Sequence, residues 1–152
     1  MLKIDVICIA KIKNNAFAKL IGMYEKRINW PLNIISLESK HIEPRKCQND
    51  EAEKILKHIN SQAVIITLDE KGKPYSSIEF SRKLQQYAND GLNHIQFIIG
   101  GADGLTKEIR QKSDLILSFG SQTWPHALAR VMLLEQIYRS QQILSGHPYH
   151  RE

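Results

Sequence analysis

The chain has 152 residues, of which 42% are hydrophobic, 24% charged and 7% aromatic, and its formal net charge is +5. This length suits one globular domain over residues 1–152, with enough chain to bury a core. No apolar run approaches the roughly 20 residues of a membrane-spanning helix, so we expect a cytoplasmic protein without a secretory signal or a membrane partner.

Five short apolar segments predict the strands of a mostly parallel sheet. They are residues 2–9, 32–37, 63–68, 94–99 and 114–119. The first alternates apolar and polar side chains before becoming continuously apolar, as in a strand that enters a core. The third and fourth are short, rich in β-branched residues and flanked by turn residues, which is typical of buried parallel strands.

Apolar residues at helical spacing fill the intervals between these strands. The helical sets are Phe17, Leu20, Ile21 and Tyr24; Ala52, Ile55, Leu56 and Ile59; and Ile78, Leu84 and Tyr87. The third set fits a helix over about residues 77–88, with Ser76 or Ser77 as its N-cap. The longest helix is predicted over residues 125–144, with Thr123 as its N-cap. Strands that alternate with helices imply an α/β fold.

Three loops follow the carboxyl ends of predicted strands, where ligands bind in open α/β sheets. They are residues 69–74, 100–104 and 120–126. The second has the spacing G-G-x-x-G, which permits close backbone approach to a ligand but more often serves a tight strand-to-helix turn. This spacing matches neither the dinucleotide motif nor the P-loop. The third loop could bind a ligand, or could begin a helix with Trp124 packed in the core.

The histidines and cysteines predict neither a metal site nor a nucleophilic site. Cys8 and Cys47 form no CxxC pair, and Cys8 lies inside a predicted strand. His147 and His150 flank Pro148, which prevents the regular spacing of a helical metal pair. The chain has no G-x-S-x-G motif. The terminal residues either form a surface tail or contribute their side chains to chemistry.

Several motifs, in order along the chain, resemble those of a known family. They are residues 67–69 (TLD), 98–105 (IIGGADGL), 123–126 (TWPH), 130–131 (RV), 134–139 (LEQIYR) and 147–152 (HPYHRE). At these spacings they are similar to the bacterial pseudouridine-N3 methyltransferases of large-subunit (23S) rRNA, which are small members of the SPOUT class. The resemblance spans essentially the whole chain and is densest from Val64 onward.

The resemblance implies a fold, a cofactor and a substrate. The fold would be an α/β domain with a C-terminal trefoil knot, working as a homodimer. The enzyme would use S-adenosylmethionine, and no metal, to methylate N3 of a pseudouridine in 23S rRNA on the assembled ribosome. The residues implied for cofactor binding are Leu68, Gly100, Gly101, Phe119, Gly120, Ser121, Gln122, Thr123, Trp124 and Pro125.

The acceptor nitrogen is a poor nucleophile while protonated, so a base or an anion-stabilising group is expected. We place His126, Arg130, Tyr149, His150 and Arg151 around the target base. His126 or His150 would accept the proton, and Arg130 or Arg151 would hold phosphate or the ring anion. A homodimer would let the tail of one subunit complete the pocket of the other.

Three other functions compete with this interpretation. A SPOUT methyltransferase that acts on another RNA site, such as a tRNA base or ribose, is disfavoured by the full-length match that includes the C-terminus. A non-catalytic RNA-binding module would use the basic first 60 residues, although such residues also form ordinary solvated surfaces. Binding of S-adenosylmethionine would separate this module from an enzyme. A nucleotide-binding domain is disfavoured because the chain lacks a phosphate loop.

Overall fold

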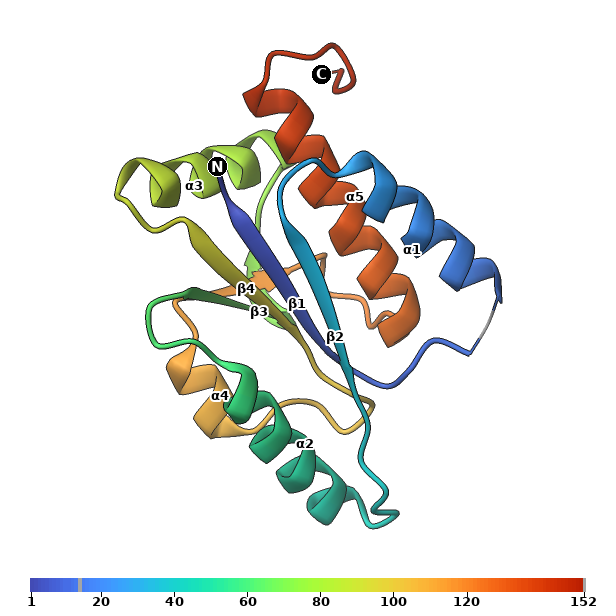
Figure 1. Ribbon diagram of the computed structural model, residues 1–152. Coiled ribbons are helices and arrows are strands. Elements are labelled where there is room, and N and C mark those ends of the chain that lie inside the picture. The colour runs from blue at the N-terminus through green and yellow to red at the C-terminus, as the bar shows by residue number, and fades with distance from the viewer. Residues whose placement is uncertain (14, 152) are drawn as a thin grey trace.

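The computed structural model describes residues 1–13 and 15–151, and these form a five-stranded parallel sheet with helices on both faces (Figure 1). The strands are β1 (Lys3–Ile9), β2 (Leu32–Leu37), β3 (Val64–Pro74), β4 (His94–Ile99) and β5 (Leu115–Ser118), in the order β2-β1-β4-β3-β5. The helices are α1 (Asn15–Arg27), α2 (Pro44–His58), α3 (Ser77–Asn89), α4 (Lys107–Lys112) and α5 (His126–Leu144). The predicted α/β class with a parallel sheet is confirmed.

The two faces of the sheet bury separate apolar clusters. In β1, Ile4 and Val6 join the cluster that α1, α3 and α5 cover, whereas Ile7 and Ile9 join the cluster under α2 and α4 (Figure 1). Successive strand residues point to opposite faces, so a strand covered on both sides needs apolar residues at nearly every position. This explains the continuous apolar run that marks the strand in the sequence.

The predicted loop over residues 69–74 is wrong, because these residues continue β3. After a register shift beyond Leu68, Lys73 pairs with Leu117 of β5. A Cβ on Gly72 would lie 2.5 Å from the carbonyl oxygen of Ile116. This glycine therefore permits a close approach of two strands. A glycine between apolar segments can thus mark a strand contact as well as a turn.

The structure confirms the predicted start of one helix and differs from the prediction for two others. Ser76 caps α3 in a capping box with Glu79, as predicted. Thr123 does not cap α5: Pro125 takes the N-cap position without a side-chain hydrogen bond, so this prediction is wrong. Helix α4, capped by Thr106, was not predicted, because its six residues are too few for a periodic apolar pattern.

Helix α5 lies along one face of the sheet and runs opposite to the direction of the strands (Figure 1). It packs against α1 and α3, begins near the carboxyl ends of the strands and ends on the opposite side of the molecule (Figure 1). Within the described part of the chain, no helix is both long and apolar enough to cross a membrane. The direction of α5 decides which of the expected site residues can meet.

Candidate functional site

The ends of β3, β4 and β5 and the loops that follow them surround one pocket of about 640 Å³. We call it the glycine-loop pocket. Its walls are Leu68–Lys71 from β3, Ile99–Ala102 with Gly104 and Leu105 from the end of β4 and the loop after it, Arg110 from α4, and Leu117, Phe119, Gly120, Gln122–His126 and Ala129 from β5 to α5. Its size and its largely apolar walls suit a small organic molecule.

Most of the residues expected to bind a cofactor line this pocket. They are Leu68, Gly100, Gly101, Phe119, Gly120, Gln122, Thr123, Trp124 and Pro125. Ser121 is exposed and does not line it. Because these residues come from three separate strand ends, parallel strands running in one direction bring them to one edge of the sheet.

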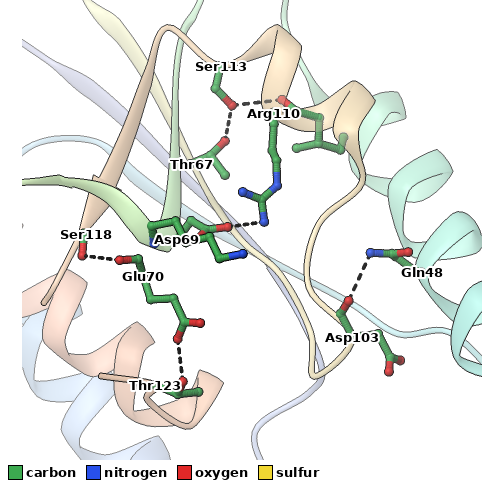
Figure 2. A network of polar contacts seen from close by, with 11 residues as sticks. Gln48, Thr67, Asp69, Glu70, Asp103, Arg110, Ser113, Ser118 and Thr123 are labelled. Carbon is green, nitrogen blue, oxygen red and sulfur yellow. Dashed lines mark hydrogen bonds and ion pairs between the residues drawn. The ribbon is translucent and has the colours of Figure 1, made fainter. Parts of the chain in front are cut away.

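The loop between β5 and α5 is held in place by the end of β3. The Ser118 hydroxyl donates to the backbone oxygen of Glu70 at 3.2 Å, and the Thr123 hydroxyl donates to Glu70 Oε2 at 2.5 Å (Figure 2). Gly120 turns the loop at a φ of +104°, a conformation that favours glycine. The pocket wall is therefore fixed by polar contacts on both sides of the turn.

The Trp124 side chain forms part of the pocket wall. Its Nε1 donates to the carbonyl oxygen of Phe119 at 3.3 Å, which closes the loop on itself. The residue is 38% exposed. The alternative in which Trp124 packs in the core is therefore wrong, and its ring presents an apolar face beside the pocket.

The opposite wall depends on α4, which sequence reasoning missed. Arg110 forms an ion pair with Asp69 of β3, and both residues line the pocket (Figure 2). Nearby, the hydroxyls of Thr67 and Ser113 share a hydrogen bond of 2.5 Å. The threonine cap before α4 is the sequence signal that could have located this helix.

Close packing explains the glycines of the second loop. A Cβ on Gly100 would lie 2.8 Å from the Leu105 side chain, and a Cβ on Gly101 would lie 2.7 Å from Glu51 Oε2. Gly104 has a φ of +78° and donates its N–H to the Gly101 carbonyl at 3.1 Å. The tight turn and the pocket wall, weighed as alternatives from the sequence, are both present.

His126 and Arg130 lie on successive turns of α5 but in different surroundings. His126 lines the glycine-loop pocket, and its Nδ1 is buried without a hydrogen-bond partner among the described residues. Arg130 is 2% exposed and does not line the pocket. Its Nη2 donates to the Ala10 carbonyl at 2.7 Å and its Nη1 to the Ser36 hydroxyl at 3.3 Å, which ties α5 to the ends of β1 and β2.

The C-terminal tail folds back onto α5. The Tyr149 hydroxyl donates to Glu135 Oε1 at 2.9 Å, and Arg139 Nη1 lies 3.1 Å from His150 Nδ1. Burial, followed by the hydrogen bond to Glu135, raises the pKa of Tyr149, so this phenol stays protonated near neutral pH. Arg151 is exposed. The tail is therefore an ordered part of the surface.

One chain does not bring the two candidate bases together. His126 begins α5, whereas the tail contacts Glu135 and Arg139, which lie roughly 14 and 20 Å farther along the helix at its ordinary rise. A smaller hollow of about 390 Å³ is lined by Glu135 and shares Leu117, Phe119 and Gly120 with the glycine-loop pocket. His126 is thus a pocket residue, and Tyr149, His150 and Arg151 of the same chain are not.

Comparison of the sequence with known families gives a match over nearly the whole chain. A family model described as "Predicted SPOUT methyltransferase" matches residues 2–150. The ribosomal RNA large subunit methyltransferase H of Rhodospirillum centenum is 44% identical over 133 residues, 87% of this chain and 88% of that protein. The protein of the same name from Zymomonas mobilis is 40% identical over 151 residues, 99% of each chain.

Two solved structures share the fold at low sequence identity. A probable methylase family protein from Haemophilus influenzae aligns with a TM-score of 0.61 at 13% identity, over 100% of this chain and 72% of that one. The SpoU methyltransferase AviRb from Streptomyces viridochromogenes, solved with AdoMet, aligns with a TM-score of 0.51 at 15% identity. That alignment covers 93% of this chain and 58% of AviRb, so this chain spans little more than half the length of AviRb.

Proposed function

Because the chain belongs to the SPOUT methyltransferase family, we propose that it transfers a methyl group from S-adenosylmethionine to large-subunit rRNA. The substrate is supported by the name of the relatives that match nearly the full chain, ribosomal RNA large subunit methyltransferase H. Our more specific proposal is that the acceptor is N3 of a pseudouridine in 23S rRNA. The enzyme would act in the cytoplasm, as a homodimer, on the assembled ribosome.

The observation that carries this proposal is the convergence of the expected cofactor residues on the glycine-loop pocket. Leu68, Gly100 and the residues from Phe119 to Pro125 other than Ser121 form its walls, although they are far apart in the sequence. A non-catalytic RNA-binding module has no need of a pocket of this kind. The pocket therefore favours the enzyme over that alternative.

The residues of the pocket fit S-adenosylmethionine. The backbone of Gly100 and Gly101 lines the pocket and would meet the adenine edge, and Leu68 and Trp124 supply apolar surface. The pocket volume of about 640 Å³ lies in the range of sites for small organic ligands. When bound, this cofactor supplies a methyl group that is already activated on a sulfonium. The contribution of the protein is then alignment and removal of the acceptor proton.

His126 is the residue best placed to take the proton from the acceptor nitrogen. It lies at the pocket wall and comes from the first turn of α5. A neutral imidazole carries a ring nitrogen with a free lone pair, so it can act as a general base. Its Nδ1 is buried and has no partner among the described residues, so Nε2 is the ring nitrogen that would take the proton from a substrate.

The position of the tail supports a homodimer in which Tyr149, His150 and Arg151 serve the partner subunit. In one chain these residues lie beside Glu135 and Arg139, away from His126. If both groups act on one base, a second copy must supply one of them. The C-terminal knot of the family remains an expectation for this chain, with α5 as the segment that would pass through the loop.

A methyl-transfer assay tests the proposed function. Ribosomes that lack the modification, and the same rRNA freed of protein, are incubated with the enzyme and S-adenosylmethionine, and the product is located by nuclease digestion and mass spectrometry. We expect one methyl group on N3 of a pseudouridine, on ribosomes only. Cofactor binding without transfer to either RNA would contradict the proposed substrate and favour another RNA such as tRNA, and absence of cofactor binding would refute the proposed enzyme activity.

A further inference from the structure

The turn formed by residues 100–104 rests on α2 on the side away from the glycine-loop pocket. Glu51 of α2 does not line the pocket, yet a Cβ on Gly101 would lie 2.7 Å from its Oε2 and 3.0 Å from its Oε1. The carboxyl group therefore fills the space directly beneath the Gly101 backbone. One turn earlier in α2, Gln48 Nε2 donates to the Asp103 carbonyl oxygen at 3.1 Å (Figure 2).

Glu51 is unusual for a carboxyl group because it is 4% exposed. Its Oε1 accepts a hydrogen bond from Cys47 Sγ at 3.4 Å, but its Oε2 is buried and has no partner among the described residues. Burial raises the pKa of Glu51. Burying a carboxyl group whose second oxygen accepts no hydrogen bond costs free energy that burying an apolar side chain would not. Nothing in the methyl-transfer chemistry above uses this group.

We propose that Glu51 is a positioning residue for cofactor binding, because its carboxyl sets the distance between α2 and the turn of residues 100–104. That distance places the backbone of Gly100 and Gly101 in the pocket wall. The inference rests on the proposed use of S-adenosylmethionine. The length of the side chain is what matters. Gln at position 51 has the same length and shape and keeps the turn in place, whereas the shorter Asp leaves a gap and the turn moves toward α2.

Three substitutions at Glu51 separate the effect of side-chain length on cofactor binding from that of charge. Glu51→Gln keeps the length of the side chain and removes the charge. Glu51→Asp keeps the charge and shortens the side chain, and Glu51→Ala removes both the length and the charge. We expect the Kd for S-adenosylmethionine, measured by calorimetry, to stay within about threefold for Gln and to rise about tenfold or more for Asp and Ala. Small displacements of binding groups have effects of this order.

Kinetics on ribosomes distinguishes positioning from a general loss of structure. For Glu51→Asp we expect KM for S-adenosylmethionine to rise in step with Kd, while kcat at saturating cofactor stays within about twofold. A partly unfolded preparation would instead show a lower kcat and an unchanged KM. Glu53→Ala is the matched control, because it removes a carboxyl from an exposed position of α2 and should change neither constant.

A double-mutant cycle tests whether Glu51 acts through Gly101. Gly101→Ala places a methyl group against the carboxyl oxygens and should weaken cofactor binding by itself. Glu51→Ala empties that space. The double variant should therefore have a Kd for S-adenosylmethionine no higher than the higher of the two single-variant Kd values. Additive losses would mean that the two residues act independently, and the proposal would be overturned.

A cation bound at this place is the competing explanation. Donor atoms of Cys47, Glu51 and Asp103 lie within 4.8 Å of one another. We therefore measure Kd with EDTA and with added Zn²⁺, and expect the same value in both. A Kd that depends on Zn²⁺, or tight binding by Glu51→Asp together with weak binding by Glu51→Gln, would overturn the proposal. Failure of the unaltered chain to bind S-adenosylmethionine would overturn both this inference and the proposed function.

Discussion

The Thr123 hydroxyl donates to Glu70 Oε2 at 2.5 Å, so a residue of the loop before α5 is joined to the second half of β3 (Figure 2). The Ser118 hydroxyl binds the backbone oxygen of the same glutamate at 3.2 Å. Glu70 is thus anchored through both its side chain and its backbone to the segment that carries Phe119 and Trp124. One wall of the glycine-loop pocket depends on these two contacts.

Replacing Thr123 by Val should weaken cofactor binding without unfolding the chain. The substitution removes the hydroxyl that holds the loop against Glu70, and a hydrogen bond of this kind contributes about 1 kcal/mol, or roughly a fivefold change in Kd. Stability should change by less than about 1 kcal/mol, because Glu70 is exposed and water replaces its partner. Calorimetry with S-adenosylmethionine and urea unfolding measure the two effects. Thr123→Ser is the control and should bind normally; unaltered affinity in Thr123→Val would contradict the prediction.

Removing the tail side chains with His150→Ala and Arg151→Ala together should abolish turnover and spare cofactor binding. The described tail contacts Glu135 and Arg139 and does not line the pocket. We expect kcat on ribosomes to fall by about 100-fold or more, the usual effect of losing an acid–base group, with Kd for S-adenosylmethionine within about twofold. Normal turnover would remove both residues from the site.

Mixing two inactive variants tests whether the site is shared between subunits. His126→Ala is mixed with the His150→Ala/Arg151→Ala variant, and the subunits are exchanged. If the tail serves the partner, each mixed dimer has one intact site, so random exchange should restore about one quarter of the unaltered activity. Activity on ribosomes is measured before and after exchange. No recovery would place the complete site within one chain.

Arg130→Met should act mainly on stability. The guanidinium is buried and donates to the Ala10 carbonyl and the Ser36 hydroxyl, whereas Met fills similar space without donors. The acceptors left behind should cost about 1–3 kcal/mol in the free energy of unfolding, measured with urea. Loss of turnover at unchanged stability would instead support the direct role with phosphate or the ring anion that the sequence suggests.

The ion pair between Asp69 and Arg110 should respond unequally to removal of its two members. The Asp69 side chain is 11% exposed and that of Arg110 is 35% exposed. Arg110→Ala strands a nearly buried carboxylate and should cost about 1–3 kcal/mol, whereas Asp69→Asn leaves an arginine that water can solvate and should cost less. Urea unfolding measures both, with exposed Lys112→Ala as the control for α4. The reverse order would mean that Asp69 is already well solvated.

The stability of Glu51→Gln relative to the unaltered chain should increase with pH. Burial raises the pKa of Glu51 above its ordinary value of 4.5, so the folded chain holds this proton more tightly than the unfolded chain. The unaltered protein therefore loses stability as pH rises from that value through the raised pKa, and Gln, which does not titrate, avoids this loss. Urea unfolding from pH 4 to pH 8 tests the trend; parallel curves for the two proteins would contradict it.

Periodicity was sufficient to predict most of the elements in this chain. The buried strands stand out because both faces of the sheet are covered, so residues such as Ile7 and Ile98 need no polar alternation. Helix α3 could be located from Ser76, because its cap is local chemistry. The second half of β3 was missed because Asp69 and Gly72 are residues typical of turns. Their strand conformation depends on β5, which follows much later in the chain.

The chemistry-bearing loops and the residues of the glycine-loop pocket could be recognised from motifs at fixed spacings, since each motif is a contiguous stretch of chain. The arrangement of these loops and residues in space could not be predicted from the motifs. Whether His126 lies near His150 depends on the direction of α5 and on the fold-back of the tail, and the contact of Glu51 with Gly101 depends on how α2 packs under the sheet. Such contacts join residues many positions apart, and local propensity carries no information about them; they exist only when the buried faces of all the elements are packed together.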